Sequence, residues 1–264
     1  MKTKIQSYLP GDHPWQNHIY WFETIDSTNT RAKEMAANGA CHGTVLIADR
    51  QTGGRGRMGR SFHSPAGSGI YMSVILRPQC NATELMHLTC ATAVAAAEGI
   101  AKATGLQPGI KWTNDLVVGR KKLGGILTEL SVSSSGMVDY AIVGIGINCT
   151  QKAEDFPEDI RTIATSLENS TGKAIDRESV IANILTHLDD ICKDLQSVDQ
   201  ILARYRKNCI TVGQEISIVR GEDIRHGKAL DVDHTGALLV EFPDGHRENI
   251  QSGEVSIRGM YGYV

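Results

Sequence analysis

The sequence predicts an α+β protein in which a mixed, largely antiparallel sheet is packed with helices and is followed by a small C-terminal β-barrel. The first observation is a series of strand-like segments between residues 109 and 148, IKW, LVV, LGGILTEL and VDYAIVGIGIN, joined by short polar turns. Such turns join antiparallel neighbours, because a parallel pair needs a long crossover. The second observation is that, from about residue 212, the long segments give way to short strand-like segments. They alternate with turns such as HTG and PDG, whose glycines supply positive φ. We therefore expect two domains, residues 1–211 and 212–264.

The first elements follow from their caps and their β-branched content. Ser27-Thr28-Asn29 precede the segment RAKEMAANG, so we expect a helix that stops at Gly39. TVLIAD at 44–49 and GIYMSVIL at 69–76 read as strands, and they enclose a loop rich in glycine and arginine. This part of the chain is expected to form strands on both sides of the loop.

Two longer helical regions complete the first domain. A long alanine-rich helix is expected after a cap at Asn81 or Thr83, with Gly105 as its end. A second helical region runs from Asp176 to about Lys207, where apolar residues recur at helical spacing. These helices are expected to cover the sheet.

Composition limits the classes of function. The chain has 264 residues, is 41% hydrophobic and has a formal net charge of −3, so general DNA binding through charge gains little support. Six cysteines show no metal-ligand spacing, and no apolar run reaches membrane length. We expect a reduced, cytoplasmic, soluble protein without a membrane or DNA partner.

The loop QTGGRGRMGRSFHSPAGSG, residues 51–69, holds six glycines and three arginines and no acidic residue. Residues 54–61 nearly match the phosphate loop G-x-x-x-x-G-K-[ST], but Arg60 stands where lysine is required and a strand follows instead of a helix. One alternative is a solvated flexible loop, as basic runs usually are. The other is a loop that becomes ordered on an anionic ligand.

A second cluster of positively charged residues lies further along the chain. The stretch KWTNDLVVGRKKLGGILTEL places cations and one carboxylate around two tight turns. These residues are Lys111, Asp115, Arg120, Lys121 and Lys122. Separately, GIGIN puts Asn148 at the end of a strand, after glycines too small to block a ligand.

In this order, the motifs DSTN, GRGRMGR, KWTNDL, KKLGGIL and GIGIN resemble the catalytic domain of biotin protein ligases, the biotin–[acetyl-CoA-carboxylase] ligase family. The resemblance covers roughly residues 20 to 150 in motif detail, and the terminal barrel is similar to that family's SH3-like C-terminal domain. The implied fold is therefore the biotin/lipoate ligase-like one.

Two departures from the family pattern change what is implied. Only about twenty-five residues precede DSTN, which is too few for the winged DNA-binding domain of members that are also repressors. A monofunctional ligase without a DNA partner is expected. Phe62 stands where the family often has tryptophan, which weakens its expected role of covering adenine.

The resemblance implies activation of biotin by ATP to biotinyl-5′-AMP, followed by transfer to a specific lysine of a biotin carboxyl carrier protein. ATP and Mg²⁺ are expected as substrate and activator, with no tightly bound cofactor. The residues expected to act in catalysis are Lys122, Arg55, Arg57 and Asp115, the last also as the Mg²⁺ ligand. Those expected to bind biotin are Ser27, Thr28, Asn29, Gln51, Gly54, Arg55, Gly56, Arg57, Trp112 and Lys122. Those expected to bind ATP or the adenylate are Arg57, Arg60, Phe62, Lys111, Asn114 and Asn148.

Structural alternatives stay open for several of these residues. Ser27 and Thr28 also suit helix caps, and Asp115 also suits a turn or the orientation of a lysine. Arg60 is equally compatible with a solvated position, and Asn148 with the closing of a strand end. For the whole protein, the alternatives are a lipoate or octanoate ligase and a nonenzymatic sensor of biotin or nucleotide. A homodimer through an exposed sheet edge is a further option.

Overall fold

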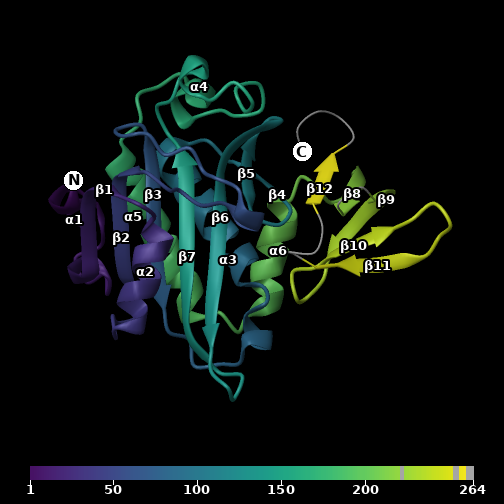
Figure 1. Ribbon diagram of the computed structural model, residues 1–264, viewed down its shortest axis with the longest axis horizontal. Coiled ribbons are helices and arrows are strands. Elements are labelled where there is room, and N and C mark those ends of the chain that lie inside the picture. The colour runs from purple at the N-terminus through teal and green to yellow at the C-terminus, as the bar shows by residue number, and fades with distance from the viewer. Residues whose placement is uncertain (221–222, 252–255, 260–264) are drawn as a thin grey trace.

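The computed structural model describes residues 1–220, 223–251 and 256–259 and shows a mixed sheet of seven strands beside a smaller antiparallel sheet (Figure 1). The strands of the large sheet lie in the order β1-β2-β3-β7-β6-β5-β4. They are β1 (Ile19–Ile25), β2 (Thr44–Gln51), β3 (Gly69–Leu76), β4 (Gly109–Lys111), β5 (Asp115–Val118), β6 (Lys121–Val132) and β7 (Val138–Asn148). β1 and β2 are parallel, and every other pair in this sheet is antiparallel. The predicted fold class is confirmed.

Helices cover both faces of the large sheet. Alternate residues of β2 divide between two buried clusters, because successive side chains of a strand point to opposite faces. Leu46 packs with Ala32 and Ala36 of α2 (Thr28–Ala37) on one face, whereas Val45 and Ile47 belong to the large core on the other. The long helices packed in that large core are α3 (Leu88–Thr104), α5 (Arg177–Lys193) and α6 (Val198–Asn208). Every residue of β3 is therefore buried.

Three elements of the large domain escape the sequence prediction. They are the edge strand β1 and the short helices α1 (Lys2–Tyr8) and α4 (Leu167–Thr171). A fourth difference concerns α3, which begins at Leu88 because Asn81 caps a separate 3₁₀ turn at Ala82–Leu85. The predicted end is confirmed, since Gly105 adopts φ +76° after the last turn.

The C-terminal sheet contains five antiparallel strands in the order β11-β10-β9-β8-β12. They are β8 (Glu215–Arg220), β9 (Asp223–Val232), β10 (Leu238–Glu241), β11 (Arg247–Ile250) and β12 (Ser256–Gly259). The predicted turn glycines are confirmed, with φ +86° at Gly236 and +85° at Gly245. Parts of the predicted C-terminal domain, residues 221–222, 252–255 and 260–264, lie outside the described residues.

Trp112 and Arg206 attach the C-terminal sheet to the large domain. The indole Nε1–H of Trp112 donates to the carbonyl of Gly236 at 2.8 Å, and Nε of Arg206 donates to the carbonyl of Val232 at 2.9 Å. The turn between β9 and β10 thus contacts the segment that follows β4. Throughout the described part of the chain, each helix is too short or too polar to pass through a bilayer.

Candidate active site

The glycine-rich loop leaves β2 and returns on itself as a narrow hairpin. The N–H of Gly56 donates to the carbonyl of Arg60 at 2.7 Å, and the N–H of Phe62 donates to the carbonyl of Gly54 at 2.9 Å. At the tip, Met58 adopts φ +56°, which is uncommon for a residue other than glycine, and its side chain is exposed. A Cβ at Gly54 would lie 2.5 Å from the carbonyl oxygen of Phe62, so only glycine allows this close return.

A pocket of about 450 Å³ lies between this loop and the sheet. The start of α2, the loop, the β4–β5 turn and the central strands β6 and β7 all contribute to its walls. Fourteen of the sixteen sequence-predicted residues line it. These are Ser27, Thr28, Asn29, Gln51, Arg55, Gly56, Arg57, Arg60, Phe62, Lys111, Trp112, Asn114, Asp115 and Lys122. Motifs separated by up to ninety-five positions in the sequence therefore meet in one cavity.

One end of the pocket is a network of uncharged hydrogen-bonding groups. Gln51 Oε1 accepts from the backbone N–H of Thr28 at 2.8 Å and lies 3.1 Å from its hydroxyl, and Gln51 Nε2 donates to the Ser64 hydroxyl at 3.0 Å. The Ser27 hydroxyl caps α2 by accepting from the N–H of Thr30. The cap role and the pocket role of Ser27 thus coexist, and β2 holds the start of α2 in place.

The side chain of Asn29 extends this network across the sheet. The Ser73 hydroxyl donates to Asn29 Oδ1 at 2.6 Å, and Asn29 Nδ2 donates to a carboxylate oxygen of Glu129 at 2.9 Å. A Cβ at Gly144 would lie 2.1 Å from Asn29 Oδ1, so this glycine of the GIGIN segment makes room for the asparagine. Because each amide atom has its own partner, the orientation of Asn29 is defined.

The other end of the pocket holds the charged residues. Lys122 Nζ lies 2.6 Å from Asp115 Oδ1, and Arg57 Nη1 donates to Asn114 Oδ1 at 2.8 Å. Burial lowers the pKa of Arg57, and the neighbouring carboxylate of Asp115 opposes that shift. Lys111 is only 7% exposed. This end therefore presents partly desolvated cations, which bind anions more strongly than exposed ones do.

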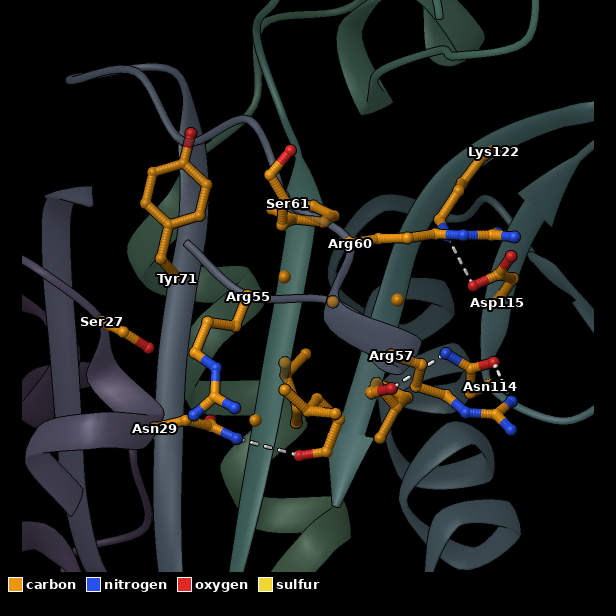
Figure 2. A pocket seen from close by; sticks show the side chains of 18 of the residues that line it. Ser27, Asn29, Arg55, Arg57, Arg60, Ser61, Tyr71, Asn114, Asp115 and Lys122 are labelled. Carbon is orange, nitrogen blue, oxygen red and sulfur yellow. Dashed lines mark hydrogen bonds and ion pairs between the residues drawn. The ribbon is translucent and has the colours of Figure 1, made fainter. Parts of the chain in front are cut away.

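The two ends of the pocket lie apart. Arg55 is at the end away from Lys122, although the sequence predicts that the two act together. Figure 2 shows the Arg55 guanidinium beside Asn29, whereas Lys122 lies beside Asp115 on the other side of the pocket. Arg55 Nη1 is 3.5 Å from the carboxylate of Glu129. The sequence predicts that Arg55, Arg57 and Lys122 act together, but the Arg55 guanidinium borders the otherwise uncharged end, beside Asn29 (Figure 2).

Two of the sixteen expected residues do not line the pocket. Gly54 lies at the base of the loop, where its role is the close backbone return. Asn148 is buried with its Nδ2 bonded to the carbonyl of Thr165 at 3.0 Å and its Oδ1 3.5 Å from Gln151 Nε2. The geometry supports the alternative in which Asn148 closes the end of β7, because its amide is used within the protein.

Two aromatic residues take positions that the sequence only partly indicates. Trp112 lines the pocket as expected, but its indole N–H is bonded to Gly236 and is directed to the C-terminal sheet. Phe62 lies over Gly146, where a Cβ would come within 2.8 Å of its ring, and it meets Tyr71 edge to face at 6.3 Å. The glycines of GIGIN thus accommodate protein side chains in this structure.

Several residues of the site were not among the expected site residues, although Met58, Ser61 and the glycines lie within the quoted motifs. The lining residues that sequence reasoning missed are Met58, Ser61, Tyr71, Met72, Gly125, Ile126, Leu127, Gly144, Ile145, Gly146 and Ile163. Most lie on β3, β6 and β7, whose apolar runs do not reveal which face meets the loop. Ser64, Ser73 and Glu129 support the lining residues from behind, and the motif TEL contained Glu129 without distinguishing it.

The acidic residues of the site do not form a metal cage. Within the described residues, no group of three or more His, Cys, Asp or Glu side chains is arranged to hold a metal ion. Among the described residues that line the pocket, Asp115 alone carries a carboxylate, and it is paired with Lys122. This contact matches the alternative in which Asp115 orients a lysine.

Comparisons with known proteins show the family to which this chain belongs. The family model described as the biotin/lipoate A/B protein ligase family matches residues 21–148, and that of the biotin protein ligase C terminal domain matches residues 211–258. The chain is 38% identical over 242 residues to the bifunctional ligase/repressor BirA of Bacillus subtilis, across 91% of this chain and 74% of that protein. It is 32% identical to the biotin–[acetyl-CoA-carboxylase] ligase of Mycobacterium tuberculosis, across 87% of this chain and 85% of that one.

A comparison with a solved structure shows that the fold is also similar. The biotin protein ligase from Aquifex aeolicus in complex with biotin and ATP superimposes with a TM-score of 0.78 and is 33% identical, covering 92% of this chain and 99% of that one. The chain therefore belongs to the biotin protein ligases, within the biotin/lipoate A/B protein ligase family.

Proposed function

We propose that this ligase activates biotin with MgATP to give biotinyl-5′-AMP and pyrophosphate, and then transfers the biotinyl group to a lysine of a biotin carboxyl carrier domain. The observation that carries the proposal is that one pocket joins an uncharged hydrogen-bonding end at Thr28 and Gln51 to a cationic end at Arg57 and Lys122. Biotin is complementary to these two ends, because it has a neutral ureido head at one end and an anionic carboxylate at the other. The pocket size also lies in the range of small-molecule sites.

In the first half-reaction, a carboxylate oxygen of biotin attacks the α-phosphorus of ATP, and the bond from that phosphorus to pyrophosphate breaks. The two anions repel each other by about 4 kcal/mol at 4 Å in an effective dielectric of 20. The Lys122 ammonium, held by Asp115, and the Arg57 guanidinium, held by Asn114, offset that repulsion. Mg²⁺ would enter with the substrate as MgATP and neutralise part of the phosphate charge, and Asp115 is the lining carboxylate that would face it.

In the second half-reaction, the amine of the acceptor lysine attacks the acyl carbon, AMP leaves, and the amine loses a proton. The intermediate is a mixed anhydride that water would hydrolyse. The hairpin loop lines one wall of the pocket, and Met58 and Phe62 add apolar surface there. Closure of this loop over the adenylate would exclude water.

The deciding experiment incubates the protein with ATP, Mg²⁺, biotin and a biotin carboxyl carrier domain. We expect release of pyrophosphate that depends on biotin, and a mass increase on one carrier lysine. Modification with lipoate or octanoate in place of biotin would support the acyl ligase alternative. Binding of biotin without pyrophosphate release would support a sensor and contradict the proposal.

Two further expectations belong to this proposal. We place the domain boundary between residues 211 and 212, which is supported by the start of the C-terminal family match at residue 211 and of β8 at Glu215. A cytoplasmic location is supported by six cysteines that are all free, because such thiols persist in reducing compartments.

A further inference from the structure

Glu129 lies outside the pocket lining, yet three residues around the uncharged end converge on its carboxylate. It accepts a hydrogen bond from Asn29 Nδ2 at 2.9 Å, and Lys33 Nζ lies 3.0 Å from its other oxygen. Arg55 Nη1 approaches the same carboxylate at 3.5 Å from the glycine-rich loop. The side chain of Glu129 is 23% exposed, so these contacts are partly shielded from solvent.

The contacts keep Glu129 charged. Burial by itself raises the pKa of its carboxyl, but the hydrogen bonds from Asn29 and Lys33 and the charges of Lys33 and Arg55 outweigh burial. The pKa therefore lies below its usual value. An ionised carboxylate only accepts hydrogen bonds, so each neighbour must turn a donor atom towards Glu129.

One consequence concerns Asn29. Since Nδ2 is used by Glu129 and by the carbonyl of Leu127 at 3.2 Å, Oδ1 must face Ser73. The Ser73 hydroxyl is also 2.8 Å from the Thr28 hydroxyl. Glu129 is thus the origin of a hydrogen-bond chain that ends at the uncharged end of the pocket.

The second consequence concerns the loop. Arg55 lies between Gly54 and Gly56, and it forms an isolated bridge with Ser61 across the hairpin. Glycines on both sides leave the backbone free to pivot, so the side-chain contact of Arg55 limits where the hairpin enters the pocket. Figure 2 shows this side chain directed to Asn29, away from the Lys122–Asp115 pair.

We infer that Glu129 is a positioning residue, which anchors Arg55 of the glycine-rich loop and fixes the amide of Asn29 so that both shape the biotin end of the pocket. This inference rests on the proposed function. It assigns Arg55 to the biotin end, apart from the charge stabilisation carried by Arg57 and Lys122. It also explains why an arginine from a loop and a carboxylate from β6 face each other beneath the pocket.

The test compares Glu129→Gln with Glu98→Gln. Glutamine at 129 keeps an acceptor for Asn29 but removes the charge that faces Arg55. Glu98 is a matched control, because it is 26% exposed and paired with Arg204 of α6, and it does not line the pocket. In adenylate formation we expect the biotin KM of Glu129→Gln to rise by about three- to ten-fold, with kcat and the ATP KM within about two-fold. Glu98→Gln should keep all three values.

A double-mutant cycle tests the contact itself. Arg55→Met should raise the biotin KM by a similar factor, and the double variant should be no worse than the poorer single variant. An unchanged biotin KM in Glu129→Gln, an equal fall in kcat, or multiplicative losses in the double variant would overturn the inference. If Glu129→Gln does not fold, Glu129→Asp replaces it in the same cycle. If the parent protein makes no adenylate, the proposed function fails, and biotin binding by calorimetry still tests the anchor with the same variants.

Discussion

At the residue scale, Lys121 and Lys122 are adjacent in sequence but differ in surroundings. Successive side chains of a strand point to opposite faces, so Lys122 reaches Asp115 and the pocket while Lys121 is exposed. Of the two, only Lys122 lines the pocket.

This pair gives a controlled test of catalysis. Lys122→Gln should slow adenylate formation on the order of 10²- to 10³-fold, as when one preorganised group facing developing charge is removed. Because its charge matters most as the two anions merge, kcat should fall more than ATP affinity. Lys121→Gln is the control and should have a small effect. Equal losses in stopped-flow pyrophosphate release would mean that the turn acts only through its summed charge.

The Thr28–Gln51 pair makes a prediction about biotin binding. Gln51→Ala removes the acceptor of the buried Thr28 N–H, and Thr28→Val removes the hydroxyl that faces Gln51. Each should cost about 1 to 3 kcal/mol in biotin binding and leave ATP binding nearly unchanged. Calorimetry measures both. Thr30→Val, on the same helix but outside the pocket lining, should bind biotin normally. Normal affinity in the Gln51 and Thr28 variants would limit both residues to structural roles.

At the element scale, the hairpin loop depends on few interactions. Three backbone hydrogen bonds cross it, those of Gly56 with Arg60, Phe62 with Gly54 and Gln51 with Ser64, and four glycines lie between residues 52 and 64. A segment with so few buried contacts opens locally at small cost. The Arg57–Asn114 and Arg55–Glu129 contacts are side-chain links that join it to the sheet.

Limited proteolysis tests whether ligands order this element. Trypsin should cut after Arg55, Arg57 or Arg60 readily in the free protein and several-fold more slowly with biotin and ATP, because a closed loop must unfold locally before cleavage. Mass spectrometry identifies the cut. Addition of ATP without biotin is the control for general stabilisation. Equal cleavage rates with and without both ligands would argue against loop closure.

At the scale of the whole molecule, two buried histidines make stability depend on pH. His13 is 4% exposed beside Trp15, and His87 is 2% exposed with Nε2 2.8 Å from the carbonyl of Leu195. Burial lowers the pKa of both. The unfolded chain, with histidine near its usual pKa of about 6.5, therefore binds more protons than the folded chain as the pH falls.

The sign of this linkage predicts acid destabilisation. Stability contributed by neutral His13 and His87 is present above about pH 6.5 and is lost as the pH falls below it. The melting temperature should be lower at pH 5.5 than at pH 7.5. His87→Gln should reduce that difference, whereas replacement of the exposed His234 should not. An unchanged pH difference in His87→Gln would remove this histidine from the explanation.

At this scale the C-terminal sheet also supports one lining residue of the pocket from behind. Trp112 lines the pocket, its indole N–H donates to the carbonyl of Gly236 at 2.8 Å, and its backbone N–H donates to the Thr211 hydroxyl at 2.9 Å. The wall of the site is thus supported from outside the large domain.

Features that depend on contiguous residues could be predicted from the sequence. The strand at 69–76, the helix cap at Ser27, the glycine stop at Gly105 and the hairpins from residue 109 to 148 agree with the structure, because caps, turns and apolar periodicity act over a few residues. The motif order likewise identified fourteen of the pocket residues.

Only the tertiary structure decided the remaining features, because they depend on which strand faces meet across distant parts of the chain. β1 has a weakly alternating sequence and becomes a strand by pairing in parallel with β2 at the sheet edge. Asn148 turned inward to Thr165, and Arg55 turned to Glu129 instead of Lys122. The amino-acid sequence by itself determined which chemical groups this ligase brings to its site. The packing of β6, β7 and the loop determined which of these groups share one end of the pocket, because the direction of a side chain is set by non-local register and burial.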